Sequence, residues 1–303
     1  MTRHVLLSTL FFTSAAIAQN DSAGNDVSDK PKLAPVMQWR FDDAKEIGPR
    51  APTYPGFPET NTAMLFTGDG KKSVVEVRDS EALRFGLNET ITLEAWVKTA
   101  GLTGAPYIIG KGRLGTKEFG VNNQNYALRL QAGKSGAQIG FLFASASVPG
   151  GEKGDWHRWW SKDTMPIQGW HHIAVSYTFG KPKSMKAIID GKAVTEGVWD
   201  MGGATDRAPV QDGDAVVIGS GSTLTSSHSL KGWLDDVAIY RGAIDVAALK
   251  AKYQFVPPPP PVAKKQVPVG RVLVQLAEEG MPEANAWPSE HPKVGETYTE
   301  DVF

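Results

Sequence analysis

Apolar and polar residues alternate with a period of two through most of the chain, from residue 35 to residue 256. In the segment ITLEAWVK, Ile91 and the second, fourth and sixth residues after it point to one side, while Glu94, Trp96 and Lys98 point to the other. The same alternation recurs in NYALRLQ, IGFLFAS, HHIAVSYTF, MKAIIDGKAV, DAVVIGS and GWLDDVAIY. Each such run predicts a half-buried strand, and turns rich in glycine, asparagine and aspartate separate the runs. Many short strands at regular spacing predict an all-β fold, a sandwich of two antiparallel sheets.

Three local signals refine this picture. Asp190-Gly191, between two apolar runs, predicts a tight hairpin, because both turn positions require positive φ. DVAALKAKY predicts a short helix with Asp245 as its N-cap. In the segment YIIGKG, strict alternation places Tyr107 in the core together with Ile109.

The two ends of the chain have a different composition. Residues 1–18 combine Arg3, an apolar run and a small-residue cleavage site, which predicts a signal peptide and hence a secreted, periplasmic or extracellular protein. Polar residues 19–34 predict a disordered leader before the sandwich of residues 35–256. A proline-rich linker follows at 257–268, and the alternation that resumes at 269–303 predicts the start of a second, truncated domain. We therefore expect the partners of the sandwich to include C-terminal domains of the same parent chain.

Composition excludes some classes of function. The chain has no cysteine, so disulfides do not stabilise it, and a structural metal ion is the other usual reinforcement of an exported domain. Its 32 basic and 33 acidic residues give a formal net charge of −1, which provides no long-range attraction to nucleic acid. No segment after residue 18 approaches the roughly 18 apolar residues of a membrane span.

A succession of motifs in this order resembles the laminin-G-like, concanavalin A-like lectin/glucanase family: WRFDD, ITLEAWVKT, YIIGKG, YALRL, IGFLFAS, GWHHIAVSYTFG, AIIDGKAV, VVIGSGS and LKGWLDDVAIYRGAIDVAALKAKY. This resemblance implies a curved jelly-roll sandwich that binds glycans or proteins, often together with a calcium ion.

Catalysis by this domain is not expected. Glucanases of the resembled family carry paired acids on one strand, spaced so that both face the scissile bond. No segment has that spacing; Glu94, for example, is the only acid on its predicted strand. Asp235 and Asp236 are adjacent, and alternation would send them to opposite faces.

A structural calcium site is the expected cofactor. Calcium requires six to eight oxygen ligands, and the candidates are Asp42 and Asp43 after the first strand and Asp235 and Asp236 in the last one. The resemblance implies that these two strands lie near each other. The alternative is that the aspartates are solvated or pair with Arg40 or Arg241. The adjacent His171 and His172 would face opposite sides, which makes them poor joint ligands.

The sequence KGDWHRWWSKD places three of the nine tryptophans within five positions, inside an insertion of roughly 25 residues. If residues 155–161 form a strand, Trp156, Arg158 and Trp160 share one face, and His157 and Trp159 share the other. An exposed Trp-Arg-Trp face would suit protein recognition or the stacking of sugar rings. The alternative is a cap in which the tryptophans form a small core of their own. Trp96 carries the same ambiguity.

These patterns together predict a secreted, non-catalytic recognition module within a larger exported protein. The predicted ligand is carbohydrate, bound by Trp156, Arg158 and Trp160 with Trp96 as a lesser contributor. The alternative is a protein-interaction or spacer domain of a large exported enzyme, which would bind an extracellular protein in place of a glycan.

Overall fold

A computed structural model describes residues 33–41, 61–70, 73–113, 123–147, 155–221 and 224–253. All of them belong to the first of the two compact units into which the chain divides, Met1–Phe255 and Val256–Phe303. The predicted signal peptide, the linker, the second domain and nearly all of the leader lie outside the described residues, so the structure leaves these predictions untested. Among the described residues, no helix is long and apolar enough to cross a membrane.

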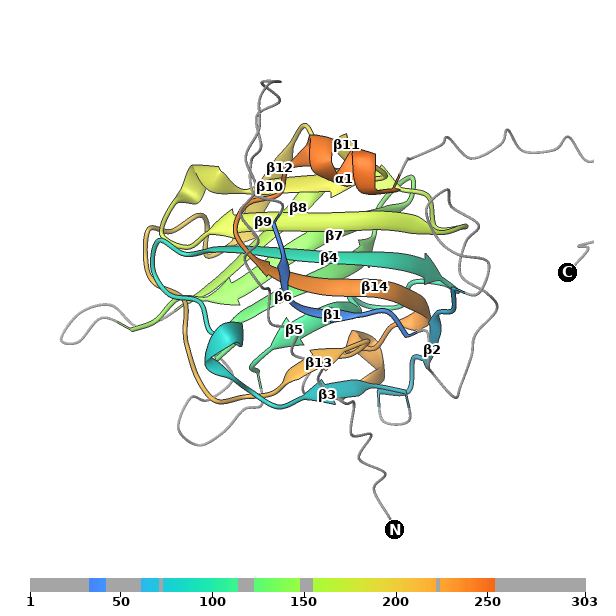
Figure 1. Ribbon diagram of the computed structural model, residues 1–303, viewed down its shortest axis with the longest axis horizontal. Helices are drawn as coiled ribbons and strands as arrows, with labels where there is room; N and C mark the ends of the chain where they lie inside the picture. The colour runs from blue at the N-terminus through green and yellow to red at the C-terminus, as the bar shows by residue number, and fades with distance from the viewer. Residues whose placement is uncertain are drawn as a thin grey trace, which may run out of the picture. The chain divides into compact units, whose positions relative to one another are not determined.

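Two seven-stranded antiparallel sheets form the sandwich, as predicted (Figure 1). Sheet A has the order β1-β14-β4-β9-β10-β11, and β2 also pairs with β14. Its strands are β1 (Pro35–Trp39), β2 (Met64–Thr67), β4 (Thr90–Thr99), β9 (His171–Thr178), β10 (Lys186–Ile189), β11 (Lys192–Ala193) and β14 (Lys231–Arg241).

Sheet B has the order β12-β8-β7-β6-β5-β13-β3. Its strands are β3 (Val75–Val77), β5 (Tyr107–Lys111), β6 (Tyr126–Ala132), β7 (Ala137–Ala144), β8 (Trp156–Met165), β12 (Gly197–Met201) and β13 (Val216–Ile218). Three short 3-10 helices lie between strands: η1 (Glu81–Leu83), η2 (Pro182–Ser184) and η3 (Ser226–His228).

The main core lies between the two sheets and follows the predicted alternation. Ile91, Leu93, Ala95 and Val97 of β4 are fully buried in it, in one cluster with Leu128 and Phe141 of sheet B. The hairpin prediction is also confirmed: Asp190 and Gly191 have φ of 48° and 69°, and Ile189 pairs with Lys192 across the turn.

The predicted helix is α1 (Val246–Tyr253), beside β10 and β11 in Figure 1. The Asp245 carboxylate accepts hydrogen bonds from the amides of Ala247 and Ala248, which confirms the N-cap. Val246 and Leu249 pack on Ala174 and Ile188, so α1 covers part of the outer face of sheet A.

Candidate functional site

The tryptophan-rich insertion forms a strand within sheet B, not a cap over the sandwich. β8 pairs with β7 on one side and with β12 on the other, and it continues to Met165, four residues beyond the predicted end. Trp159 joins the main core, and Trp156 packs outside that core against Tyr107, Ala127 and Leu142. The prediction that alternation divides these tryptophans between two faces is therefore confirmed.

Glycines on the neighbouring strands make room for two of the indole rings. A Cβ added at Gly140 of β7 would fall well inside van der Waals distance of three carbons of the Trp160 ring. A Cβ added at Gly197 of β12 would fall equally close to the Trp159 ring. Each indole therefore lies across a glycine of the adjacent strand, which fixes Trp160 flat against the outer face of sheet B.

Cations and aromatic rings alternate across this outer face. The Arg113 guanidinium lies 5.0 Å from the Trp156 ring centre, and the Arg129 guanidinium lies 4.5 Å from that of Tyr107. The Trp160 ring has Arg158 at 5.6 Å and Arg129 at 5.9 Å. Six residues make up this surface, from β5, the segment just after β5, β6 and β8. We call them the Arg–aromatic face: Tyr107, Arg113, Arg129, Trp156, Arg158 and Trp160.

Hydrogen bonds hold the arginines of this face in place. Arg158 donates from two nitrogens to the Asp200 carboxylate at 2.8 and 2.9 Å, and this bond raises the pKa of Arg158. Arg113 Nη1 donates to the Tyr107 hydroxyl at 2.6 Å. Arg129 Nη2 donates to the Ala105 carbonyl at 2.9 Å, so the guanidiniums are fixed by the sheet and its flanking loops.

His228, at the border of the Arg–aromatic face, has a pKa that burial and the positive charge of this face lower together. The His228 ring lies 5.6 Å from that of Tyr107, and Nδ1 is 3.1 Å from the Thr225 hydroxyl oxygen. Burial, followed by the charges of Arg113 and Arg129, lowers the pKa of His228 to about 4. His228 is therefore neutral at physiological pH.

Exposure divides the four predicted ligand-binding residues. Trp156 and Arg158 are half-buried, while Trp160 is only 4% exposed and Trp96 is fully buried. Trp96 belongs to the outer face of sheet A, where its ring lies 5.4 Å from that of His172. Neighbouring groups cover it completely, so it offers no open surface for a ligand, and we leave it out of the proposed site.

Sequence reasoning placed Tyr107 on the wrong side of sheet B, although its burial is confirmed at 1% exposed, and it missed Arg113 and Arg129. A β-bulge between Tyr107 and Ile109 shifts the register, so that both Ile108 and Ile109 enter the main core and Tyr107 turns outward. Arg129 occupies an outward position between Leu128 and Leu130, a signal that was visible in the sequence. No sequence signal brings Arg113 to Trp156, since the two are 43 positions apart and meet through sheet pairing.

Two of the four aspartates predicted to bind metal, Asp235 and Asp236, lie at another bulge, in β14. Asp236 has φ of 48°, and the register shifts between Asp235 and Ala238. The bulge turns both carboxylates to the outer side of sheet A, where alternation had predicted opposite faces. Asp235 accepts from Asn61 Nδ2 at 2.7 Å, and Asp236 accepts from Gln38 Nε2 at 2.6 Å.

These contacts do not by themselves form a calcium site. Both oxygens of Asp235 already accept hydrogen bonds, one from Asn61 and one from the Asp236 amide. Arg40 Nε lies 3.8 Å from Asp236, as the alternative interpretation predicted, whereas Arg241 pairs with Glu89. Asp42 and Asp43 lie outside the described residues, and the described ones contain no group of three or more acids and histidines placed to hold a metal ion.

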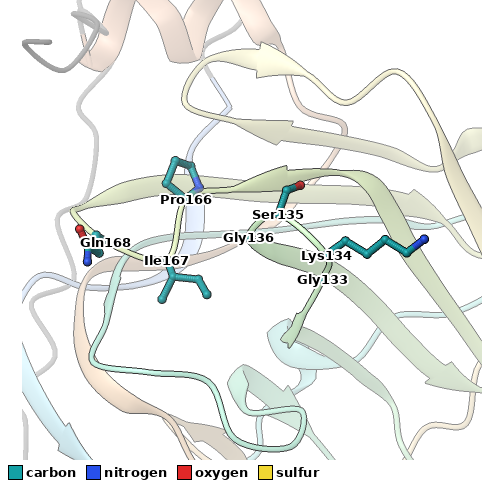
Figure 2. A pocket seen from close by; sticks show the side chains of 7 residues that line it. All are labelled: Gly133, Lys134, Ser135, Gly136, Pro166, Ile167 and Gln168. Carbon is teal, nitrogen blue, oxygen red and sulfur yellow. The ribbon is translucent and has the colours of Figure 1, made fainter. Parts of the chain in front are cut away.

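A hollow of about 410 Å³ lies at one end of sheet B, between the β6–β7 turn and the segment after β8 (Figure 2). Gly133–Gly136 and Pro166–Gln168 line it. Lys134 is the one charged residue of this lining, and none of the lining residues is aromatic. The hollow therefore offers little to a sugar ring compared with the Arg–aromatic face.

Comparison with known proteins agrees with the fold. The sequence model of the family described as the concanavalin A-like lectin/glucanases superfamily (Laminin_G_3) matches residues 69–250, more than half of the chain. The chain belongs to this family. The resemblance inferred from the motifs is thus confirmed, while a search of curated proteins finds no match.

Solved structures of similar fold include binding domains of several kinds. Domain 4 of AbnA, a GH43 extracellular arabinanase from Geobacillus stearothermophilus, solved with arabinotriose, is 17% identical, with 74% of this chain and 100% of that one covered at a TM-score of 0.45. CBM40 of the Ruminococcus gnavus IT-sialidase is 13% identical, with 73% and 100% covered at 0.41. The SAP-like pentraxin of Limulus polyphemus is 13% identical, with 63% and 81% covered at 0.42. At these scores the likeness carries no argument about the ligand of this chain.

Proposed function

We propose that this domain is a non-catalytic module that binds carbohydrate through the Arg–aromatic face of sheet B. The observation that carries the proposal is the placement of Trp156 and Arg158, both partly accessible, beside the flat Trp160 indole on one rigid sheet face. Aromatic rings offer apolar surface to the C–H faces of sugars, and guanidiniums donate to their oxygens. The family to which the chain belongs is itself described as lectins and glucanases.

Recognition fits the acids of this domain better than hydrolysis does. On the Arg–aromatic face, the carboxylate of Asp200 is engaged by Arg158 through two hydrogen bonds. On sheet A, Glu94 is 1% exposed and lies 2.9 Å from His172 Nε2, while Asp235 is bonded to Asn61. None of these acids is presented to a substrate as one of a facing pair.

Affinity electrophoresis of the full chain through gels containing soluble polysaccharides tests the proposal. We expect retardation by at least one polysaccharide and about tenfold weaker binding, equivalent to about 1.4 kcal/mol, in Trp156→Ala. Trp233→Ala is the matched control, because Trp233 is also half-buried and lies under a cation, Lys98 at 5.1 Å, but on sheet A.

Equal loss of binding in the two variants would contradict the proposed site. Retardation by no polysaccharide would overturn the proposed function and favour protein recognition, the alternative predicted from the sequence. We also propose that the protein is exported and is part of a larger protein, as predicted from residues 1–18 and 257–303. Calcium binding stays a proposal as well, because two of its four predicted ligands, Asp42 and Asp43, lie outside the described residues.

A further inference from the structure

The Arg–aromatic face carries an excess of positive charge. Among the described residues, Arg158 forms a salt bridge, with Asp200, whereas Arg113 and Arg129 form none and donate to a hydroxyl and a carbonyl. The whole chain is nearly neutral, at a net charge of −1. The concentration of guanidinium groups is therefore a local property of this face and not a reflection of composition.

Of these three arginines, Arg129 is the most deeply buried, so burying its charge costs the most free energy. It is 5% exposed, and burial lowers its pKa, with the charges of Arg113 and Arg158 adding to that effect and Tyr107 opposing it. Burying a charge that has no counter-ion is expensive, and the cost falls when an anion approaches. The three guanidiniums are thus close enough to repel one another and would be stabilised together by one bound anion.

The Trp160 indole supplies an independent observation. Its Nε1–H is buried and has no hydrogen-bond partner among the described residues, although the side chain is held flat against Gly140. A buried donor without an acceptor costs about 1–3 kcal/mol, so such groups in folded proteins call for an explanation. Neighbouring groups also cover this nitrogen, so a ligand would reach it only if they moved, and the partly exposed Arg113, Trp156 and Arg158 carry the inference.

We infer that the Arg–aromatic face binds an anionic glycan, whose carboxylate or sulfate group lies between Arg113 and Arg158 and whose sugar ring lies against Trp156. A guanidinium suits either anion, because its planar fork donates two parallel hydrogen bonds to two oxygens. Arg129 acts from below as a positioning residue that raises the positive potential, because its side chain is buried whereas Arg113 and Arg158 are partly exposed. This inference rests on the proposed function and adds the chemical class of the sugar.

Pairs of related polymers, one anionic and one neutral, test the inference by affinity electrophoresis of the full chain. Polygalacturonate is compared with its methyl ester, a sulfated galactan with unsulfated agarose, and polyglutamate serves as an anion without sugar. We expect at least about tenfold tighter binding to one anionic polysaccharide than to its neutral counterpart, and the preferred pair identifies the anion as carboxylate or sulfate.

Arginine variants locate the anion on the protein. Arg113→Gln and Arg158→Gln should each weaken binding to that anionic polysaccharide about tenfold. Arg78→Gln is the matched control, because Arg78 is exposed and follows β3, at the opposite edge of sheet B. A change in Arg78→Gln as large as in the other two variants would overturn the site.

Other outcomes separate this inference from the function on which it rests. Equal binding to a charged polysaccharide and to its neutral counterpart would overturn the inference and leave carbohydrate binding standing. Equal binding to polyglutamate would also overturn it, because charge without a sugar would then suffice. Binding to none of the polysaccharides would overturn both.

Discussion

The position of the Trp160 ring makes the Gly140→Ala substitution a sharp test of the structure. Gly140 lies in the middle of β7, and its φ is not in the left-handed region, so the backbone itself accepts alanine. The obstacle is steric: the new Cβ would overlap Cε3, Cζ3 and Cη2 of Trp160. Because Trp160 is packed between Arg129 and Arg158, the ring has to move away from the sheet and disturb both contacts.

Two opposing terms set the magnitude. Overpacking a well-packed site costs about 1–3 kcal/mol. Replacing a glycine inside a strand by alanine returns about 0.5–1 kcal/mol through the entropy of the unfolded chain. Because the new Cβ would lie well inside van der Waals distance of Cζ3, the steric cost falls at the upper end of its range, about 2–3 kcal/mol. The net prediction is a loss of about 1–2.5 kcal/mol, which for a domain of this size lowers the melting temperature by about 2–10 °C.

Urea unfolding followed by circular dichroism, with a double-mutant cycle, measures this effect. In a Trp160→Leu background the clash is absent, so Gly140→Ala should become neutral or stabilising. Gly197→Ala is the matched control: it should also lower stability, through Trp159, but should leave polysaccharide binding unchanged because Trp159 faces the core. A neutral Gly140→Ala in the wild-type background, or an equal cost in both backgrounds, would refute the reasoning.

Three further predictions concern ionisable groups. Lys111 is fully buried and lies 3.0 Å from one oxygen of Asp79, whose other oxygen stays bonded to Arg84, so Lys111→Met should lower the unfolding free energy by about 1.5–3 kcal/mol in urea titrations; a loss below about 1 kcal/mol would contradict this. Burial lowers the pKa of His171, but its bond and charge interaction with Asp190 outweigh that effect and raise it. The resulting stability is fully present below the unfolded value of about 6.5 and is lost as pH rises through the folded pKa; Asp190→Asn should remove this dependence in melting curves from pH 5 to 8, and an unchanged curve would oppose it. Saturation with the preferred anionic polysaccharide should raise the pKa of His228 above about 4 in NMR titrations of the imidazole, and a constant value would place the anion elsewhere.

The sequence was sufficient for the fold because its core obeys a simple period. In β4 and β8 the residues that alternation sends inward, such as Leu93 and Trp159, are in the main core. Turn chemistry was equally readable at Asp190-Gly191, where two adjacent positive φ angles are required. These features depend on neighbouring residues in the chain.

The candidate site was only partly readable, for two physical reasons. Bulges shift the alternation by one residue, which turned Tyr107 outward and brought Asp235 and Asp236 to one side. Exposure depends on groups far away in sequence: Trp160 is buried because a glycine of β7 accepts its ring and two arginines flank it. Neither the bulges nor this burial can be predicted from the residues next to the affected position.

The tryptophan run therefore contributes both to the core and to the proposed recognition face, which the sequence presented as alternatives. Trp159 anchors β8 to the core, and one residue later Trp160 is fixed on the opposite face by Gly140. The same strand pairing that stabilises the sandwich thus holds Trp156, Arg158 and their neighbours in place before any ligand arrives. A ligand that binds there pays little to order the protein, because the contacting groups come from strands and are already held by hydrogen bonds and ring contacts. The positive potential follows from the same rigidity, since the guanidiniums stay close together even though they repel one another.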